Sequence, residues 1–158
     1  MISPVKESLD EALLSAFLQT DYLVICQGEQ ICVRIGQQHP VIDQLAGMQP
    51  WAILTAANPG TEPLGDEENR RRHRQLQQSA ARAELQTWPS INRDQSRQWE
   101  DEHGLLLIAP ATDWLLAQAK RFGQLGLVYG QPQHKAELWL TVPCHPANTS
   151  DYVREVGA

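Results

Sequence analysis

The stretch WAILTAANPG, residues 51–60, decides the fold that we expect. Residues 51–57 are apolar except for Thr55, and the Asn-Pro-Gly sequence that follows is a strong strand breaker. A continuous apolar run, as opposed to an alternating one, is typical of an interior strand that is covered on both faces. Similar apolar runs at residues 105–109 and 125–129 predict two further strands of the same sheet.

Two amphipathic helices are expected between these strands. Residues 66–86 begin with Asp66 as the helix N-cap, and acidic residues fill the first turn, where the helix dipole favours them. The second helix stops at Gly123 and carries apolar residues at helical spacing, namely Leu115, Ala119 and Phe122. A β-α-β-α-β order of this kind favours parallel strands joined by right-handed crossovers.

The N-terminal part is predicted to be a helix followed by a β-hairpin. Apolar residues recur at helical spacing over residues 4–18. The segment YLVICQGEQICVRIG, residues 22–36, has a central Gly-Glu pair that matches a type II′ turn, which would place Cys26 opposite Ile31. Because side chains alternate along strands, this register puts Cys26 and Cys32 on opposite faces, and we expect no disulfide between them.

The remaining segments are predicted to be two polar connections and one strand. Residues 37–50 and 89–103 are expected to be loops, whereas the alternating pattern of residues 136–142 indicates an edge strand or one exposed on one face. The predicted fold class is α/β, a single compact domain over residues 1–145. Its mixed sheet has central parallel strands and flanking antiparallel hairpins, in the order α-β-β-β-α-β-α-β-β. Residues 146–158 are expected to form a loose C-terminal tail.

Composition and charge exclude several classes of function. The chain has 158 residues, a net charge of −6 and a pI near 5.3, which argue against nucleic acid and anionic membranes as partners. The sequence contains no long apolar run and no secretory signal pattern, so a cytoplasmic location is expected. It also contains no glycine-rich phosphate loop, no nucleophile elbow and no cysteine spacing typical of metal sites, so we expect neither a cofactor nor a metal.

Five short pieces between residues 20 and 130 form a recognisable series. They are Thr20-Asp21-Tyr22, Thr55-Ala56-Ala57-Asn58-Pro59, Glu68-Asn69 with Arg72 and Leu76, Trp99-Glu100, and Arg121-Phe122-Gly123-Gln124. In order and spacing the series resembles the bacterial family known as domain of unknown function 3293, although Leu125 and residues 101–103 depart from its pattern. The resemblance implies a cytoplasmic domain without an assigned activity, whose polar pieces form one set.

The candidate site residues follow from where these polar pieces lie. Asn58 comes directly after a buried strand, and Asn69 and Arg72 lie near the start of the next helix. Ligands of α/β sheets gather beyond the carboxyl ends of strands, where helix N-termini present free N–H groups. Asn58, Asn69, Arg72, Gln124 and Glu100 are therefore candidates for a ligand-binding crevice. An arginine fork there would suit a carboxylate or a phosphate.

A structural interpretation of the same residues also stays open. The asparagines would then be caps, and Arg72 would hold loop carbonyls or Glu100. In either case Arg72 is expected to lean toward the strand end, whereas Arg70, Arg71 and Arg74 point to water.

Three classes of function remain, and the sequence favours them in a definite order. A module that binds a small anionic ligand comes first. A protein-interaction domain without chemistry of its own, with a protein partner or a homo-oligomer, comes second. An enzyme that uses an acidic residue near the crevice comes third.

Overall fold

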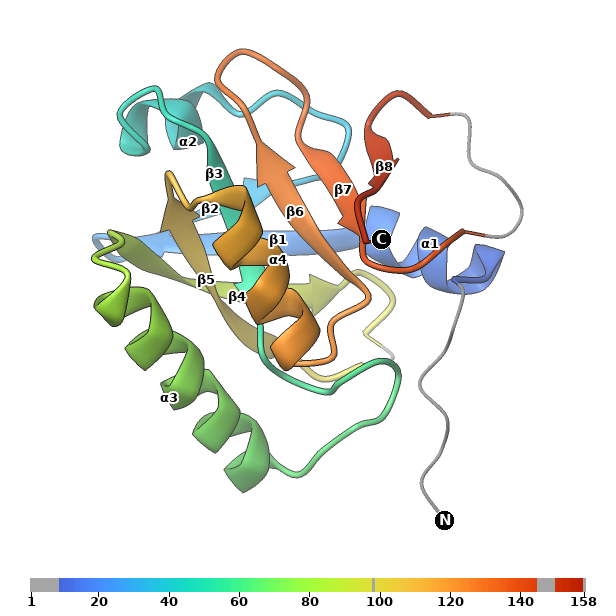
Figure 1. Ribbon diagram of the computed structural model, residues 1–158. Helices are drawn as coiled ribbons and strands as arrows, with labels where there is room; N and C mark the ends of the chain where they lie inside the picture. The colour runs from blue at the N-terminus through green and yellow to red at the C-terminus, as the bar shows by residue number, and fades with distance from the viewer. Residues whose placement is uncertain (1–8, 98, 145–149, 158) are drawn as a thin grey trace.

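In the part of the chain that the structure describes, eight strands form one sheet and four helices cover its faces (Figure 1). The computed structural model describes residues 9–97, 99–144 and 150–157. The strands are β1 (Thr20–Cys26), β2 (Glu29–Val33), β3 (Trp51–Thr55), β4 (Thr87–Asp94), β5 (Glu102–Ile108), β6 (Gly126–Gly130), β7 (Glu137–Leu140) and β8 (Val153–Glu155). The helices are α1 (Glu11–Leu18), α2 (Pro40–Leu45), α3 (Asp66–Arg82) and α4 (Thr112–Arg121). The mixed α/β class predicted from the sequence is thereby confirmed.

The predicted parallel pairing of the central strands is wrong. The strands lie in the order β2-β1-β4-β5-β3-β6-β7-β8, and β3 pairs antiparallel with both β5 and β6. The crossovers through α3 and α4 do join strands that run in the same direction, β3 with β4 and β5 with β6. Each crossover skips one position of the sheet, and a strand of the other crossover fills it. Parallel pairs are therefore absent from this central region of the described sheet.

The strand β4 is an interior element of the sheet that the sequence did not indicate. Its residues fall partly in the predicted loop, and its Pro89 suggested the end of a helix. Proline is tolerated here because β1 pairs with β4 only from Ser90 onward. The N–H that Pro89 lacks therefore removes no hydrogen bond between β1 and β4. With α2, β4 and β8 added, the order becomes α-β-β-α-β-α-β-β-α-β-β-β.

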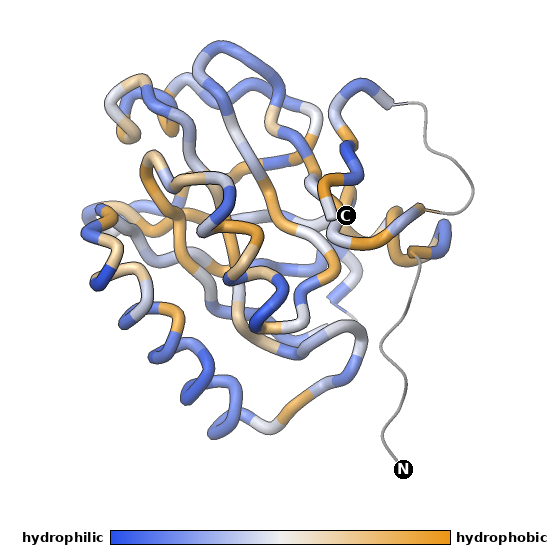
Figure 2. Tube along the Cα trace, viewed as in Figure 1, coloured by the Kyte–Doolittle hydropathy of each residue, from blue (hydrophilic) through white to orange (hydrophobic). Residues whose placement is uncertain are grey.

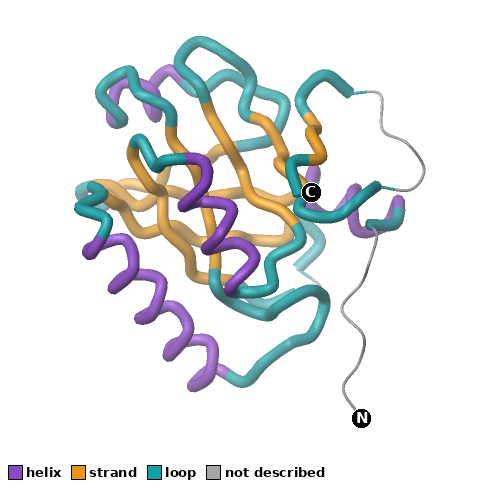
Figure 3. Tube along the Cα trace, in the orientation of Figure 1, coloured by secondary structure: helices purple, strands orange, loops and turns teal. Residues whose placement is uncertain are grey.

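Helices lie on both faces of the sheet (Figures 1 and 3), and β3 and β6 are buried along their whole length. Alternate residues of β3 face opposite ways: Ile53 joins a core with α1 and α2, and Leu54 joins a core with α3 and α4. Hydrophobic residues concentrate in the sheet, whereas α3 is mostly hydrophilic along its length (Figure 2). The inward stripe of α3 is the exception, with Leu76 and Ala80 buried as predicted.

The hairpin differs from the prediction by two residues in register. Val24 lies opposite Ile31, and Cys26 lies opposite Glu29 instead of Ile31. The turn is Gln27-Gly28, with φ of 52° and 82°, and two successive positive φ values define a type I′ turn. Because a shift of two residues preserves the alternation of side chains, Cys26 and Cys32 still lie on opposite faces, and both thiols are free.

The chain outside the central sheet is more ordered than predicted. The expected loop at residues 37–50 contains α2, and β8 places residues of the expected tail beside β7, so β7 is not an edge strand. The first helix begins at Glu11 with Asp10 as its N-cap; residues 4–8, predicted to be helical, lie outside the described residues. None of the described helices combines the length and the hydropathy that a membrane crossing requires.

Candidate functional site

The predicted site residues gather at one end of the sheet. At this end β3 and β4 finish and β5 and β6 begin, because their directions alternate across the sheet. The N-terminal half of α3 and the C-terminal end of α4 lie beside it. We call the residues that meet there the sheet-end cluster; it comprises Asn58, Asn69, Arg72, Glu102 and Gln124.

The two asparagines bind each other and hold the connection from β3 to α3. The Asn58 backbone N–H donates to Asn69 Oδ1 over 3.1 Å, and Asn69 Nδ2 donates to Asn58 Oδ1 over 2.9 Å. The same Asn58 oxygen accepts from the N–H of Leu64. Asn58 has φ of 49°, a left-handed conformation that asparagine tolerates well. The pair therefore fixes the sharp exit of the chain from β3.

Arg72 leans toward the end of β3, as predicted. Its Nε donates to the carbonyl oxygen of Ala56 over 2.6 Å, and its Nη2 donates to that of Phe122. No residue in the described ranges accepts a hydrogen bond from its Nη1. One edge of the guanidinium thus joins β3 to the end of α4, which matches the structural interpretation of this arginine.

The other arginines of α3 lie where the sequence places them. The side chains of Arg70, Arg71 and Arg74 are exposed. Arg71 forms an ion pair with Glu68 at 2.6 Å, on the surface, where such pairs contribute little to stability.

Gln124 is buried and shares one carbonyl acceptor with Arg72. Its Nε2 donates to Ala57 O over 2.8 Å and to Phe122 O over 3.2 Å. The carbonyl of Phe122 therefore accepts from both Gln124 and Arg72. Four of the five predicted residues thus lie together at the end of the sheet.

Glu100 does not join the cluster, and Glu102 takes the place predicted for it. Glu100 is exposed, whereas Glu102 Oε2 accepts a hydrogen bond from Asn58 Nδ2 over 2.8 Å. Sequence reasoning missed Glu102 because it began this strand at residue 105. The signal was present: Glu102 lies two and four residues before Gly104 and Leu106, so it faces the same side of β5.

Glu102 lies in a row of polar side chains across three strands. Tyr22, Asn92 and Glu102 are direct neighbours in the register of β1, β4 and β5. Burial raises the pKa of the Glu102 carboxyl, and hydrogen bonds from the side chains of Asn58 and Asn92 partly oppose that rise. Burial, together with the charge of Glu102, also raises the pKa of Tyr22. Glu102 is thus a half-buried acid in a polar row.

We expect Glu102→Gln to stabilise the protein more at about pH 7 than at about pH 4. The pKa of this carboxyl is higher in the folded protein than in the unfolded chain. The free energy of unfolding therefore falls as the pH rises through the folded pKa and the carboxyl loses its proton. At a pH below the pKa of the unfolded chain, this loss of stability is absent. Glutamine keeps a side-chain oxygen that can accept the hydrogen bond from Asn58 Nδ2. Urea unfolding at both pH values measures the effect, with the exposed Glu100→Gln as control. Equal changes in both variants at both pH values would contradict it.

Two arginines of the sheet end lie over one aromatic ring. The guanidinium carbons of Arg72 and Arg121 lie 5.5 Å and 4.8 Å from the centroid of the Phe122 ring. Neither guanidinium forms an ion pair with a carboxylate in the part of the chain that the structure describes. The start of α3 differs, because its first turn carries three acidic residues that disfavour an anion there.

Comparison with known proteins finds one family model that matches the part of the chain with the sheet-end cluster. The model of the family described as protein of unknown function (DUF3293) matches residues 54–127, and this bears out the resemblance seen in the sequence. The matched region runs from the end of β3 to the start of β6, and it contains every residue of the sheet-end cluster. No curated protein and no solved structure matches the chain. The description of the family assigns no activity, so a function has to be argued from the site.

Proposed function

We propose that this domain binds a small anionic ligand, a carboxylate or a phosphate, at the sheet end beside Phe122. The observation that carries the proposal is the placement of Arg72 and Arg121 over one ring without a carboxylate partner in the described residues. Guanidinium groups bind carboxylates and phosphates through paired, charge-assisted hydrogen bonds. Glu68 acts on Arg72 only at longer range, and two guanidinium groups without an ion pair in the described residues favour such a ligand.

The contacts of Arg72 support a preorganised donor. Two carbonyl groups hold its Nε and Nη2, so the orientation of the guanidinium is set before a ligand arrives. Its Nη1 remains to donate. Arg121 is exposed and has one long contact, 3.4 Å to Gln118 Oε1, which a ligand can replace. Asn58, Asn69 and Gln124 support the backbone around this position.

The proposed location is the cytoplasm. Cys26, Cys32 and Cys144 are all free thiols, which is typical of proteins in a reducing compartment.

A thermal-shift screen of nucleotides, sugar phosphates and carboxylic acids tests the proposal. We expect at least one anion to raise the melting temperature of the wild type, and Arg121→Ala to abolish that rise while retaining the baseline stability. Arg72→Ala is expected to abolish it too, and to lose roughly 1–3 kcal/mol of stability with its two carbonyl contacts. Arg71→Ala is the matched control; because its ion pair with Glu68 lies on the surface, we expect little change in stability and an unaltered ligand response.

Two outcomes would reject anion binding at this position. One is a ligand response that Arg121→Ala and Arg72→Ala leave intact. The other is no response to any anion, with Arg72→Ala merely destabilised, which would make Arg72 a structural residue. If Arg72→Ala and Arg71→Ala showed equal, small effects, neither role of Arg72 would hold.

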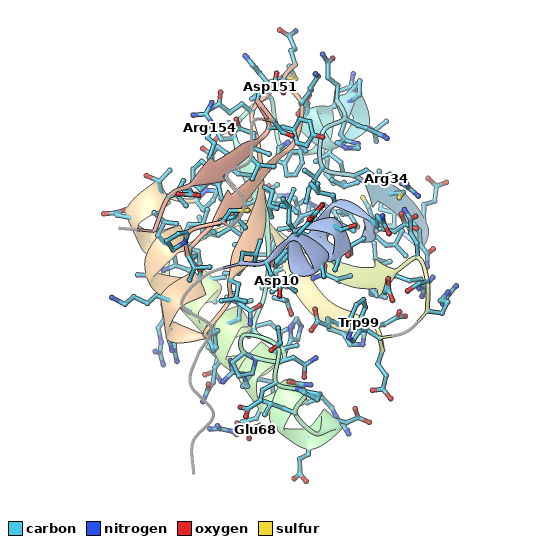
Figure 4. All side chains as sticks on the ribbon, turned by 90° about the vertical axis from the view of Figure 1, so that its right-hand side faces the viewer. Asp10, Arg34, Glu68, Trp99, Asp151 and Arg154 are labelled. Carbon is cyan, nitrogen blue, oxygen red and sulfur yellow. The ribbon has the colours of Figure 1, made fainter. Side chains whose placement is uncertain are left out.

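A protein-interaction role is the second candidate, and exposed apolar side chains favour it. Val41 and Trp99 are 59% and 60% exposed, and Trp99 lies in the β4–β5 connection, below α1 in Figure 4. A cavity of about 420 Å³ lies between the β1–β2 hairpin and α2, with Ile31, Val41 and Leu45 in its lining. An enzymatic role comes third, supported by the contact of Glu102 with Asn58.

A further inference from the structure

Two histidines meet where α3 packs on β5, directly after Arg72 and Glu102 in the sequence. His73 belongs to α3 and His103 to β5, and their ring centroids lie 6.3 Å apart with planes tilted by 58°. His103 lies opposite Ile91 of β4, on the sheet face that α3 covers. The two residues are 30 positions apart (103 minus 73), so no short motif in the sequence indicates that they meet.

His73 has an unused ligating atom. Its Nδ1 is buried and has no hydrogen-bond partner among the described residues. A buried polar atom without a partner costs free energy, and a bound metal ion removes that cost when it takes the lone pair. Burial of His73, and to a lesser degree the neighbouring His103, lower the pKa of the His73 ring.

We propose that His73 and His103 together bind a divalent transition metal ion such as Zn²⁺, through one nitrogen from each ring. Metal–nitrogen bonds of about 2.0–2.1 Å in tetrahedral geometry place two imidazole centroids roughly 5 Å apart. The pair therefore has to close by about 1 Å. His103 is exposed, so rotation of its side chain allows this movement.

The site has two protein ligands, and water completes the coordination. No group of three or more His, Cys, Asp or Glu side chains that could hold a metal occurs within residues 9–97, 99–144 and 150–157. The nearby Asp101 carboxylate is bound to Arg93 at 2.8 Å and is not counted as a ligand. Such a site binds more weakly than a closed structural zinc site, and it leaves open positions on the metal.

Thermal unfolding of chelator-treated protein in increasing Zn²⁺ or Ni²⁺ tests this proposal. We expect a rise in melting temperature of roughly 3–6 °C when the free metal reaches ten times its dissociation constant. His103→Gln is expected to abolish the rise; because His103 is exposed, this variant keeps the fold. His73→Gln should abolish it as well. His134→Gln, at another exposed histidine, is the control and should respond as the wild type does.

Two results would overturn the metal site. A metal response that persists in the double variant His73→Gln/His103→Gln would place the metal elsewhere, for example on the cysteines. The absence of any response in the wild type would equally reject it. Isothermal titration calorimetry adds an independent readout, with an expected stoichiometry of one metal per chain that the His103→Gln variant loses. The test uses no anion, so it is independent of the proposed ligand at Arg72 and Arg121.

Discussion

Replacing Gly130 by alanine is expected to lower the free energy of unfolding by about 3 kcal/mol. Gly130 is the residue opposite Trp51 in the β3–β6 pair, and a Cβ atom added to it would lie 2.1 Å from Trp51 Cε2. The indole cannot move aside easily, because it is 1% exposed and its Nε1 donates to Asp43 Oδ1. Side chains in a core packed this closely have to shift against their neighbours, and that overpacking destabilises the fold.

Urea unfolding of Gly130→Ala beside Gly65→Ala measures this effect. A Cβ added at Gly65 meets no atom within 4 Å, and Gly65 lies at the exposed start of α3. Its replacement should cost less than about 1 kcal/mol, the usual effect of alanine at an N-cap position. If both substitutions lowered the free energy of unfolding equally, the contact with Trp51 would not be what makes alanine unfavourable at Gly130.

Replacing Asp43 by alanine is expected to cost roughly 2–4 kcal/mol, because a buried indole N–H and a backbone N–H lose their acceptor. Asp43 is 4% exposed; its Oδ1 accepts from Trp51 Nε1 and its Oδ2 from the N–H of Gln133, each over 3.0 Å. The carboxylate therefore joins α2, β3 and the β6–β7 connection. Alanine leaves the indole N–H inside the core without a partner.

Thermal and urea unfolding of Asp43→Ala should be compared with Asp66→Ala. Asp66 occupies the first turn of α3, as Asp43 does in α2, but it is exposed. Its loss should cost at most about 1 kcal/mol, the contribution of an acidic residue to the helix dipole. A cost at Asp43 no larger than that at Asp66 would mean that the indole N–H finds another acceptor.

The polar residues of the site illustrate how far sequence reasoning reaches. Helical periodicity put Arg72 on the inward stripe with Leu76, and the structure places its guanidinium on the end of β3. The position of Asn58 after an apolar strand likewise predicted its place at the sheet end. Glu102 was missed because strand boundaries are the least certain part of a pattern-based assignment. The contact between His73 and His103 depends on how α3 packs on β5. A pattern of neighbouring residues in the sequence does not predict that packing.

What the sequence by itself determined is the identity and burial of the main elements. Continuous apolar runs marked β3 and β5 as interior strands and β6 as a further strand, and Gly123 marked the end of α4. These are local consequences of hydrophobic periodicity and backbone preference, which act within a few residues. The opposite faces of Cys26 and Cys32 followed in the same way from the two-residue period of a strand.

Only the tertiary structure decided the direction and neighbours of the strands. A strand that is buried on both faces shows the same apolar run whether its neighbours are parallel or antiparallel. The interlocking of the two crossovers depends on β4, whose polar residues and proline conceal it within the sequence. That arrangement brings the ends of β3 and β4 beside the starts of β5 and β6. Long-range pairing, not local pattern, therefore assembles Asn58, Arg72, Glu102 and Gln124 at one place.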